Sequence, residues 1–392
     1  MTPIAEIQEQ LKEQGLDGWL FYDHHVRDAL AYSILRFQAP RTPTRRWYYL
    51  IPAEGEPVAL THRIEPKMLD ALPAGKRLLY SSHPSMHEQL RHMLHGRTRV
   101  AMQHSPLCEI PYVAMVDAGT VDLIRSFGVD VASSANLVQH FQARWSAEQL
   151  ETHLEAGRRV DKVRAEAFFQ VFEAIRCKWA VTEFEIAEFI RRRFAEEGLI
   201  TDHGPIVAVN ANASNPHYEP THDTPVPIAA GDLVLIDMWA KLAEPTDAVY
   251  YDITWTGFCG IMPPLAMLSV FETVRDARKK ASQFVIDGVA AGRTLRGFEV
   301  DDVARGHIRE AGYADYFVHR TGHSIGTDVH GTGANMDNLE SHDTRLIIPR
   351  TCFSVEPGVY LASFGIRSEV NVYVGEGKAM VTGEQQEELL RL

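Results

Sequence analysis

The stretch LIDMWAKLAEPTDAVYYDITW, residues 235–255, places two aspartates inside runs of apolar and aromatic residues. Two such runs separated by the polar segment EPTD predict a pair of strands joined by a hairpin tip. Aspartate is depleted in strands and is seldom buried without a partner. Asp237 and Asp252 are therefore predicted to point into a core where something compensates their charge.

Two further carboxylates show the same pattern. Glu356 interrupts FSVEPGVY (353–360), and Glu369 interrupts IRSEVNVYV (366–374). Taken singly, each carboxylate also fits an exposed edge strand or a salt bridge. Four carboxylates in one core would repel one another strongly, and a multivalent cation removes that repulsion. Oxygen ligands with one imidazole suit Mn²⁺, Zn²⁺, Co²⁺ or Fe²⁺, bound as a pair.

The candidates for the imidazole ligand are the three histidines of HRTGHSIGTDVHG, residues 319–331. His319 and His323 are four residues apart, which on a helix would suit a single zinc ion. The glycines at 322 and 326 disfavour a helix here, so the spacing is no evidence of shared ligation.

Bulk properties exclude several classes of protein. The chain has 392 residues, a length that predicts two domains. Its net charge is −13, and its sequence has no basic stretch of the kind typical of nucleic-acid binding proteins. No apolar run approaches the ~18 residues of a membrane span, and the N-terminus lacks the pattern of a signal peptide. The four cysteines are irregularly spaced. Reduced thiols and a cytoplasmic location are therefore predicted.

The predicted pattern of helices and strands changes near residue 143. Residues 1–143 alternate strand and helix patterns, which predicts a small α/β domain. Ser146 and Gln149 form a capping box before a long amphipathic helix, and Thr182 and Glu185 form a second one. Paired strands follow, so residues 144–392 are predicted to form an α+β domain.

The ordered set of Asp, Asp, His, Glu and Glu resembles the ligand set of the pita-bread metallopeptidases. The resemblance covers residues 144–392 in motif order, and residues 1–143 look like the N-terminal domain of the creatinase, prolidase and aminopeptidase P branch. It implies a C-terminal pita-bread catalytic domain, most similar to an Xaa-Pro dipeptidase. The implied metal ligands are Asp237, Asp252, His323, Glu356 and Glu369. Asp247, in the hairpin tip, is a rival of Asp252, which is preferred because DIT matches the family pattern.

The resemblance also implies roles around the ligands. Glu356 would handle the proton of the attacking water, His330 and His217 would assist catalysis, and a hydroxyl of Thr254 would support the ligands. The implied substrate-side residues are His319 and Arg367. A pocket that accepts proline needs an aromatic lining, for which Tyr218 and Tyr360 are candidates. The family often has an acidic residue after the second catalytic histidine, whereas this chain has Gly331.

The implied reaction is hydrolysis of the Xaa-Pro bond in dipeptides or short peptides by a hydroxide activated by two divalent ions, with Mn²⁺, Zn²⁺ and Co²⁺ left open. Aminopeptidase P activity on longer peptides with proline in second position is the first alternative. A non-catalytic or non-peptidase pita-bread protein is the second. The expected partners are small proline-containing peptides and a second copy of the chain, with no nucleic acid and no membrane. His24 and His25 are predicted to lie in a solvated turn or to reach an active site.

Overall fold

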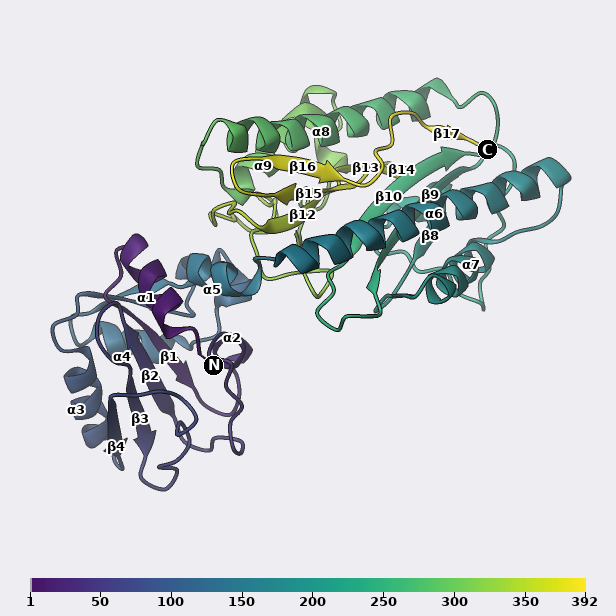
Figure 1. Ribbon diagram of the computed structural model, residues 1–392. Coiled ribbons are helices and arrows are strands. Elements are labelled where there is room, and N and C mark those ends of the chain that lie inside the picture. Colours follow the sequence, from purple (N-terminus) through teal and green to yellow (C-terminus); the bar gives the residue numbers. More distant parts are fainter. Residues whose placement is uncertain (1) are drawn as a thin grey trace. The chain divides into compact units, whose positions relative to one another are not determined.

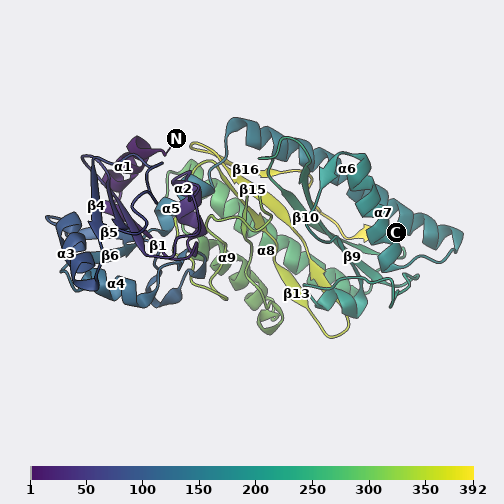
Figure 2. The ribbon, with the colours of Figure 1, turned by 90° about the horizontal axis from the view of Figure 1, so that it is seen from below.

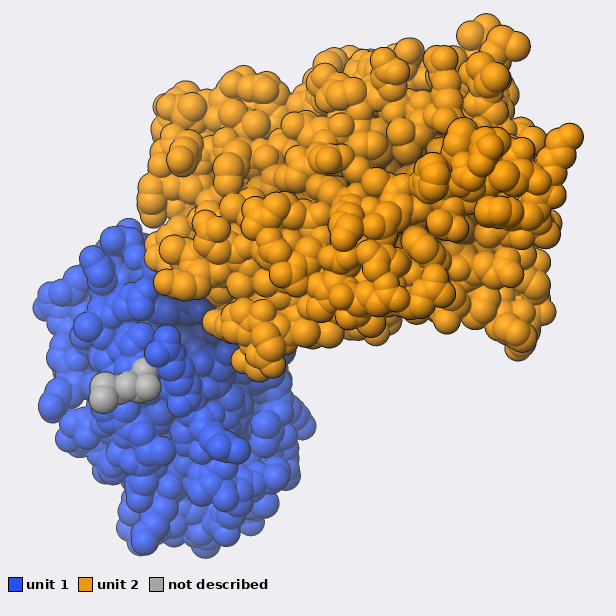
Figure 3. All heavy atoms as spheres, turned by 45° about the vertical axis from the view of Figure 1, so that its right-hand side comes forward, with its two compact units in different colours: residues 1–142 blue, residues 143–392 orange. Residues whose placement is uncertain are grey.

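The computed structural model describes residues 2–392, which divide into two compact units. The N-terminal unit ends at Gln142, and the C-terminal unit comprises Ala143–Leu392 (Figure 3).

The N-terminal unit is a six-stranded sheet in the order β4-β3-β2-β1-β5-β6 (Figure 1). Its strands are β1 (Gly18–Asp23), β2 (Trp47–Pro52), β3 (Val58–His62), β4 (Lys76–Tyr80), β5 (Arg99–Met102) and β6 (Asp130–Ser133). Its helices are α1 (Ile4–Glu13), α2 (Ala29–Ile34), α3 (His83–Leu94), α4 (Ala118–Arg125) and α5 (Ala135–Gln142), with short 3₁₀ turns η1 (Pro106–Cys108) and η2 (Pro111–Val113). Strand β2 runs antiparallel to β1 and β3, and the other neighbours are parallel.

Both faces of this sheet are buried. Trp19 and Phe21 of β1 belong to a core shared with α1, α2 and α5, whereas Leu20 and Tyr22 belong to a second core shared with α3 and α4. Successive strand residues point to opposite faces, so a strand between two helical layers is apolar throughout.

The C-terminal unit contains two larger sheets and one short hairpin. Its helices are α6 (Ala147–Cys177), α7 (Glu183–Glu196), α8 (Leu265–Ala290) and α9 (Gly297–Glu310), with 3₁₀ turns η3 (Asn210–Ser214) and η4 (Ala314–Tyr316). The first sheet comprises β7 (Leu199–Ile200), β8 (Ile206–Val209), β9 (Leu233–Leu242), β10 (Tyr251–Phe258) and β17 (Leu390–Arg391). The second comprises β11 (Ser324–Ile325), β12 (Thr351–Val355), β15 (Val370–Val374) and β16 (Ala379–Thr382), and β13 (Gly358–Tyr360) pairs with β14 (Gly365–Arg367).

Long helices cover the outer sides of the two sheets. Helix α6 packs along β9 and β10, and α8 packs along β14, β15 and β16 (Figures 1 and 2). The predicted capping boxes are confirmed: the Ser146 hydroxyl accepts from the Gln149 backbone N–H, and Thr182 does the same for Glu185.

The predicted C-terminal strand pair is present but interrupted. The pairs Val355↔Val370 and Gly358↔Arg367 belong to one continuous register, which places Glu356 opposite Glu369 across the gap. Pro357 follows Glu356 and has no N–H to donate to a ladder, which contributes to the break. The sequence periodicity predicted two unbroken strands and did not show that both carboxylates lie at this interruption.

Two further expectations can be compared with the structure. All four cysteines are free thiols. Among residues 2–392, no helix combines the length and the apolar character that crossing a bilayer demands.

A buried histidine ties α6 to both sheets. The His153 Nδ1–H donates to the Tyr250 carbonyl at 2.7 Å, and the Thr382 hydroxyl lies 2.7 Å from Nε2. The carbonyl can only accept, so the ring is the Nδ1-protonated neutral tautomer. Burial lowers the pKa of His153 from 6.5 to about 4.

This pKa shift predicts a loss of stability in mild acid. The unfolded chain binds a proton at His153 near pH 6.5, whereas the folded chain binds one only near pH 4, so stability falls as pH decreases between these values. The contribution is roughly 3 kcal/mol at most. Urea unfolding of wild type and His153→Gln at several pH values should show a smaller decrease for the variant over this window. His222→Gln, which changes an exposed loop, should follow the wild type.

A candidate dinuclear metal centre

The pairing of β9 with β10 sets the positions of the two aspartates. Asp237 lies opposite Thr254, and Asp252 lies opposite Trp239, so both carboxylates are on one face of the sheet as diagonal neighbours. Both residues are buried, whereas Asp247 is exposed in the connecting loop. Of the two rivals, Asp252 is therefore the one placed in the core.

The glutamate hairpin meets this face directly. The Glu369 backbone N–H donates to the Thr254 carbonyl at 3.1 Å, which joins the interrupted hairpin to β10. The Thr254 hydroxyl also donates to Glu369 Oε2 at 2.9 Å. This double link brings carboxylates of both hairpins close together.

His323 comes from an extended segment and not from a helix. The His323 carbonyl accepts from the Ser354 backbone N–H at 2.9 Å, which holds the segment against β12. A Cβ on Gly322 would lie 1.9 Å from the Ser354 carbonyl oxygen, so this approach requires glycine. Gly331 is similarly constrained, because a Cβ there would lie 2.9 Å from Ser324 Oγ. The acidic side chain that the family often has at this position would require Ser324 to move.

Three of the predicted ligands form a compact group. Ligand atoms of Asp252, His323 and Glu369 all lie within 4.8 Å of one another, and all three residues are buried. His323 Nε2 is 3.5 Å from Asp252 Oδ2 and 3.4 Å from Glu356 Oε1.

Asp237 joins this group through an arginine. Arg367 Nη2 donates to Asp237 Oδ2 at 2.6 Å, and Arg367 Nε donates to Thr254 Oγ1 at 3.1 Å. The hydroxyl of Thr254 in turn contacts Glu369, so one chain of hydrogen bonds connects the carboxylates of both hairpins.

The electrostatics of the group are those of an unbalanced anion cluster. Burial raises the pKa of Asp252 and of Glu369 well above the usual range. The charges of Asp237 and Glu356 raise the pKa of Asp252 further, and the charge of Asp252 does the same for Glu369. Burial also acts to raise the pKa of Glu356, but the nearby His323, His319 and Arg367 outweigh it and lower that pKa. Burial lowers the pKa of His323, which favours a neutral ring.

These residues fit a divalent cation. The His323 Nδ1 faces the Ser324 carbonyl at 3.2 Å, so the neutral ring carries its proton there and turns the Nε2 lone pair toward the carboxylates. Asp237 Oδ1, Asp252 Oδ1 and Glu369 Oε1 are buried without a hydrogen-bond partner in the structure. Lone pairs that converge without protons between them are stabilised by a metal ion.

His319, Tyr360 and Arg367 form a second hydrogen-bond network, and His330 lies beside His323. The His319 Nδ1–H donates to the Arg320 carbonyl at 2.7 Å, and the Tyr360 hydroxyl is 2.6 Å from His319 Nε2. Arg367 Nη1 donates to the same hydroxyl at 3.0 Å. The His330 ring stands edge-on to His323, with centroids 4.3 Å apart, and burial beside His323 lowers the pKa of His330 to about 4.

His217 and Tyr218 lie outside the two groups described above. His217 is exposed, and its ring makes no hydrogen bond to any described residue. The Tyr218 hydroxyl donates to buried Glu183 at 2.5 Å and accepts from Asn212 Nδ2 at 3.1 Å. The hydroxyl of Tyr218 is thus already engaged, and only its ring is free to line a cavity.

Three supporting residues were missed in the sequence. Ser354 Oγ accepts from the His323 backbone N–H at 2.9 Å and donates to Glu356 Oε1 at 3.0 Å. Asn371 accepts from the Asp252 backbone N–H at 3.0 Å. Glu183 accepts from the Val209 N–H at the end of β8 and from Asn212 Nδ2 of η3. Ser354 and Asn371 each stand two residues from a predicted ligand on an apolar strand. This spacing places them on the same face as the ligand and could have identified them in the sequence.

A cluster of buried carboxylates and one imidazole on paired strands is typical of a hydrolytic metal centre. The chain belongs to metallopeptidase family M24, whose family model matches residues 151–376. Members of such a family use divalent metal ions, and the C-terminal unit has the pita-bread fold. The predicted family and fold class are confirmed.

Individual relatives agree with this assignment. An Xaa-Pro dipeptidase of Lactobacillus helveticus is 32% identical over 247 residues, which cover 62% of this chain and 60% of the relative. The chain spans about half the length of the first curated relatives it matches. A prolidase of Thermococcus sibiricus aligns over 99% of this chain and 98% of its own, with TM-score 0.59 and 24% identity. An X-Pro aminopeptidase of Thermotoga maritima aligns over 100% of both chains, with TM-score 0.57 and 21% identity. The two structures share the fold with this chain.

Removal of one aspartate should discriminate the ligand from its rival. Asp252→Asn removes a buried charge from the group, and we expect Mn²⁺ affinity to fall by at least about 100-fold. Asp247→Asn removes the same charge from the exposed loop and should bind Mn²⁺ like the wild type. Titration calorimetry of chelator-treated protein measures both. Equal affinities of the two variants would contradict the placement of the site.

Proposed function

We propose that this protein hydrolyses the bond between an amino acid and a following proline, and that dipeptides are its preferred substrates. The observation that carries the proposal is the buried group of Asp252, His323 and Glu369 with Glu356 beside it. The similarity to an Xaa-Pro dipeptidase supports the choice of substrate. The predicted homodimer and a cytoplasmic location, which the free cysteines favour, belong to the same proposal.

The metal ligands would be Asp237, Asp252, His323, Glu356 and Glu369, holding two ions. Mn²⁺, Zn²⁺ and Co²⁺ all suit this set of oxygens and one nitrogen. When bound, such ions lower the pKa of a water molecule and polarise the substrate carbonyl. Arg367 would keep Asp237 oriented, because its guanidinium contacts the Oδ2 atom and leaves Oδ1 free.

Proton handling would fall to Glu356. Ser354 donates to Oε1, so Oε2 is the oxygen available to accept a proton from the attacking water. Its lowered pKa keeps the carboxylate ionised and ready to act as a base. His330, whose ring stands beside that of His323, would donate a hydrogen bond to the substrate as charge develops on the substrate carbonyl oxygen.

The substrate side would be formed by the His319–Tyr360–Arg367 network. The Tyr360 hydroxyl receives a hydrogen bond from Arg367 and directs its own proton to His319, so all three side chains are fixed in orientation. A rigid aromatic ring beside a fixed cation suits a prolyl ring with a free carboxylate. The ring of Tyr218 is a further candidate for contact with the substrate. The side chain of His217 would have to turn inward to reach the substrate.

A peptide panel tests the proposal. We expect Ala-Pro to be cleaved with kcat/KM at least about tenfold above Ala-Pro-Ala in the presence of Mn²⁺, because a dipeptidase binds the free prolyl carboxylate. Gly-Gly should be a poor substrate. A preference for Ala-Pro-Ala would favour an aminopeptidase P activity instead, and cleavage of neither peptide would contradict both.

His330 should affect turnover without affecting metal content. His330→Ala removes a donor that faces the substrate, so we expect kcat to fall by about 100-fold or more with unchanged bound metal. His342→Ala, at an exposed position of the same unit, serves as the control. Metal analysis and steady-state kinetics on the same preparations provide both readouts. Loss of metal from His330→Ala would show instead that His330 is a ligand.

A further inference from the structure

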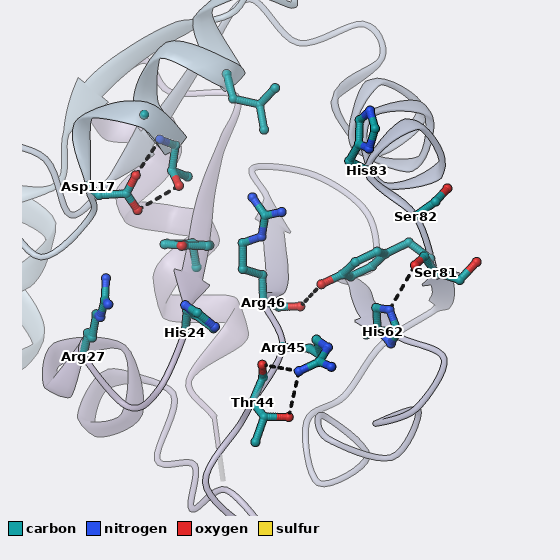
Figure 4. A pocket seen from close by; sticks show the side chains of 15 residues that line it. His24, Arg27, Thr44, Arg45, Arg46, His62, Ser81, Ser82, His83 and Asp117 are labelled. Atoms are coloured by element: carbon teal, nitrogen blue, oxygen red, sulfur yellow. Dashed lines mark hydrogen bonds between the residues drawn. The ribbon is translucent and has the colours of Figure 1, made fainter.

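A cavity lies within the N-terminal unit. It has a volume of about 800 Å³ and opens at one edge of the sheet, where β1, β3 and β4 end and β2 begins. The first residues of α3 and α4 complete its wall (Figure 4). A cavity of this size holds a ligand much larger than an inorganic ion.

The cavity is positively charged on a chain whose net charge is −13. Arg27, Arg45 and Arg46 line it, and no carboxylate of the described chain forms an ion pair with any of them. Among the described lining residues, Asp117 is the single acid. Its carboxylate caps α4, accepting from the Thr120 N–H at 2.8 Å and from the Thr120 hydroxyl at 2.9 Å. Three guanidinium groups are thus left without an internal counter-ion.

Arg46 has a central position in this cavity. Figure 4 shows the Arg46 side chain in the middle of the cavity, between the helix starts that carry His83 and Asp117. Burial lowers the pKa of His24, and the charges of His25, Arg27 and Arg46 lower it further, so the positive charge of the cavity rests on the arginines.

A strained loop holds one of these arginines in place. His25 and Val26 have φ of 66° and 58°, a left-handed conformation that is unusual for a β-branched residue. Asp23 holds the loop by accepting from the Val26 N–H at 2.9 Å and from the Arg27 N–H at 2.7 Å. Strain that the surroundings hold in this way is characteristic of binding sites.

From these observations we propose that the cavity binds a small organic phosphate of nucleotide size. Guanidinium groups pair with phosphate oxygens through two parallel hydrogen bonds, and the hydroxyls of Thr44, Ser81 and Ser82 line the same cavity. The volume beyond the phosphate is bordered by the rings of Tyr80 and His62, which stand edge-to-face with centroids 4.8 Å apart. A planar base or a sugar suits such a surface.

Calorimetric titration with ADP tests this proposal. The background is Asp252→Asn treated with chelator, so that a nucleotide cannot bind through a metal ion in the C-terminal unit. At low ionic strength we expect saturable binding of one ADP per chain, weaker binding of inorganic phosphate, and a decrease of affinity with added salt. Citrate, which has a similar charge without phosphorus, should bind at least about tenfold more weakly than ADP.

Matched arginine variants locate the site. Arg46→Met should weaken ADP binding by about tenfold or more, whereas Arg63→Met removes the same charge from an exposed position outside the cavity and should have little effect. Arg45→Met is the second cavity variant, because Arg45 is exposed and its loss should leave folding intact. Circular dichroism of each variant monitors the fold.

Three results would overturn the proposal. The first is no saturable ADP binding below about 1 mM. The second is equal weakening by Arg46→Met and Arg63→Met. The third is citrate binding as tight as ADP binding, which would identify a carboxylate site. None of these results depends on the peptidase activity of the C-terminal unit.

Discussion

The C-terminal unit is organised around carboxylates that are buried together and cannot compensate one another. Asp252 and Glu369 each carry a buried oxygen without a partner, and neighbouring carboxylates raise the pKa of both. In a medium of low dielectric this arrangement is unfavourable unless a cation joins it. The Thr254 and Asn371 hydrogen bonds fix where these carboxylates are, but they do not remove the charge.

The two aspartates differ in whether a protein side chain already compensates their negative charge. Asp237 has an internal partner, because Arg367 lies 2.6 Å from its Oδ2 atom. Asp252 instead faces the lone pair of a neutral His323. The same guanidinium also contacts Tyr360 and Thr254, so it links the ligand shell to the side where a substrate would lie. One arginine therefore couples the orientation of Asp237, a proposed metal ligand, to that of Tyr360 on the proposed substrate side.

The sequence predicted those parts of the site that depend on local patterning. Asp237 and Asp252 stood out because they interrupt apolar strands, and Ser146 and Thr182 were recognised as caps from neighbours three residues away. Long-range partners were not predictable in this way. Nothing near Tyr218 in the sequence indicates Glu183, and strand periodicity does not show that Glu356 and Glu369 face each other across a broken ladder. Motif order likewise gave no indication that His217 is exposed.

The link between the two hairpins also determines when the centre can form. Asn371 and Asp252 contact each other across 119 positions of the chain. Closing a loop of that length is entropically costly, so such contacts form late in folding. The β9–β10 hairpin can form early from local contacts, with its aspartates still hydrated. We therefore expect the anion cluster to be desolvated in one of the last folding steps, and an early folding intermediate to hold a divalent ion only weakly.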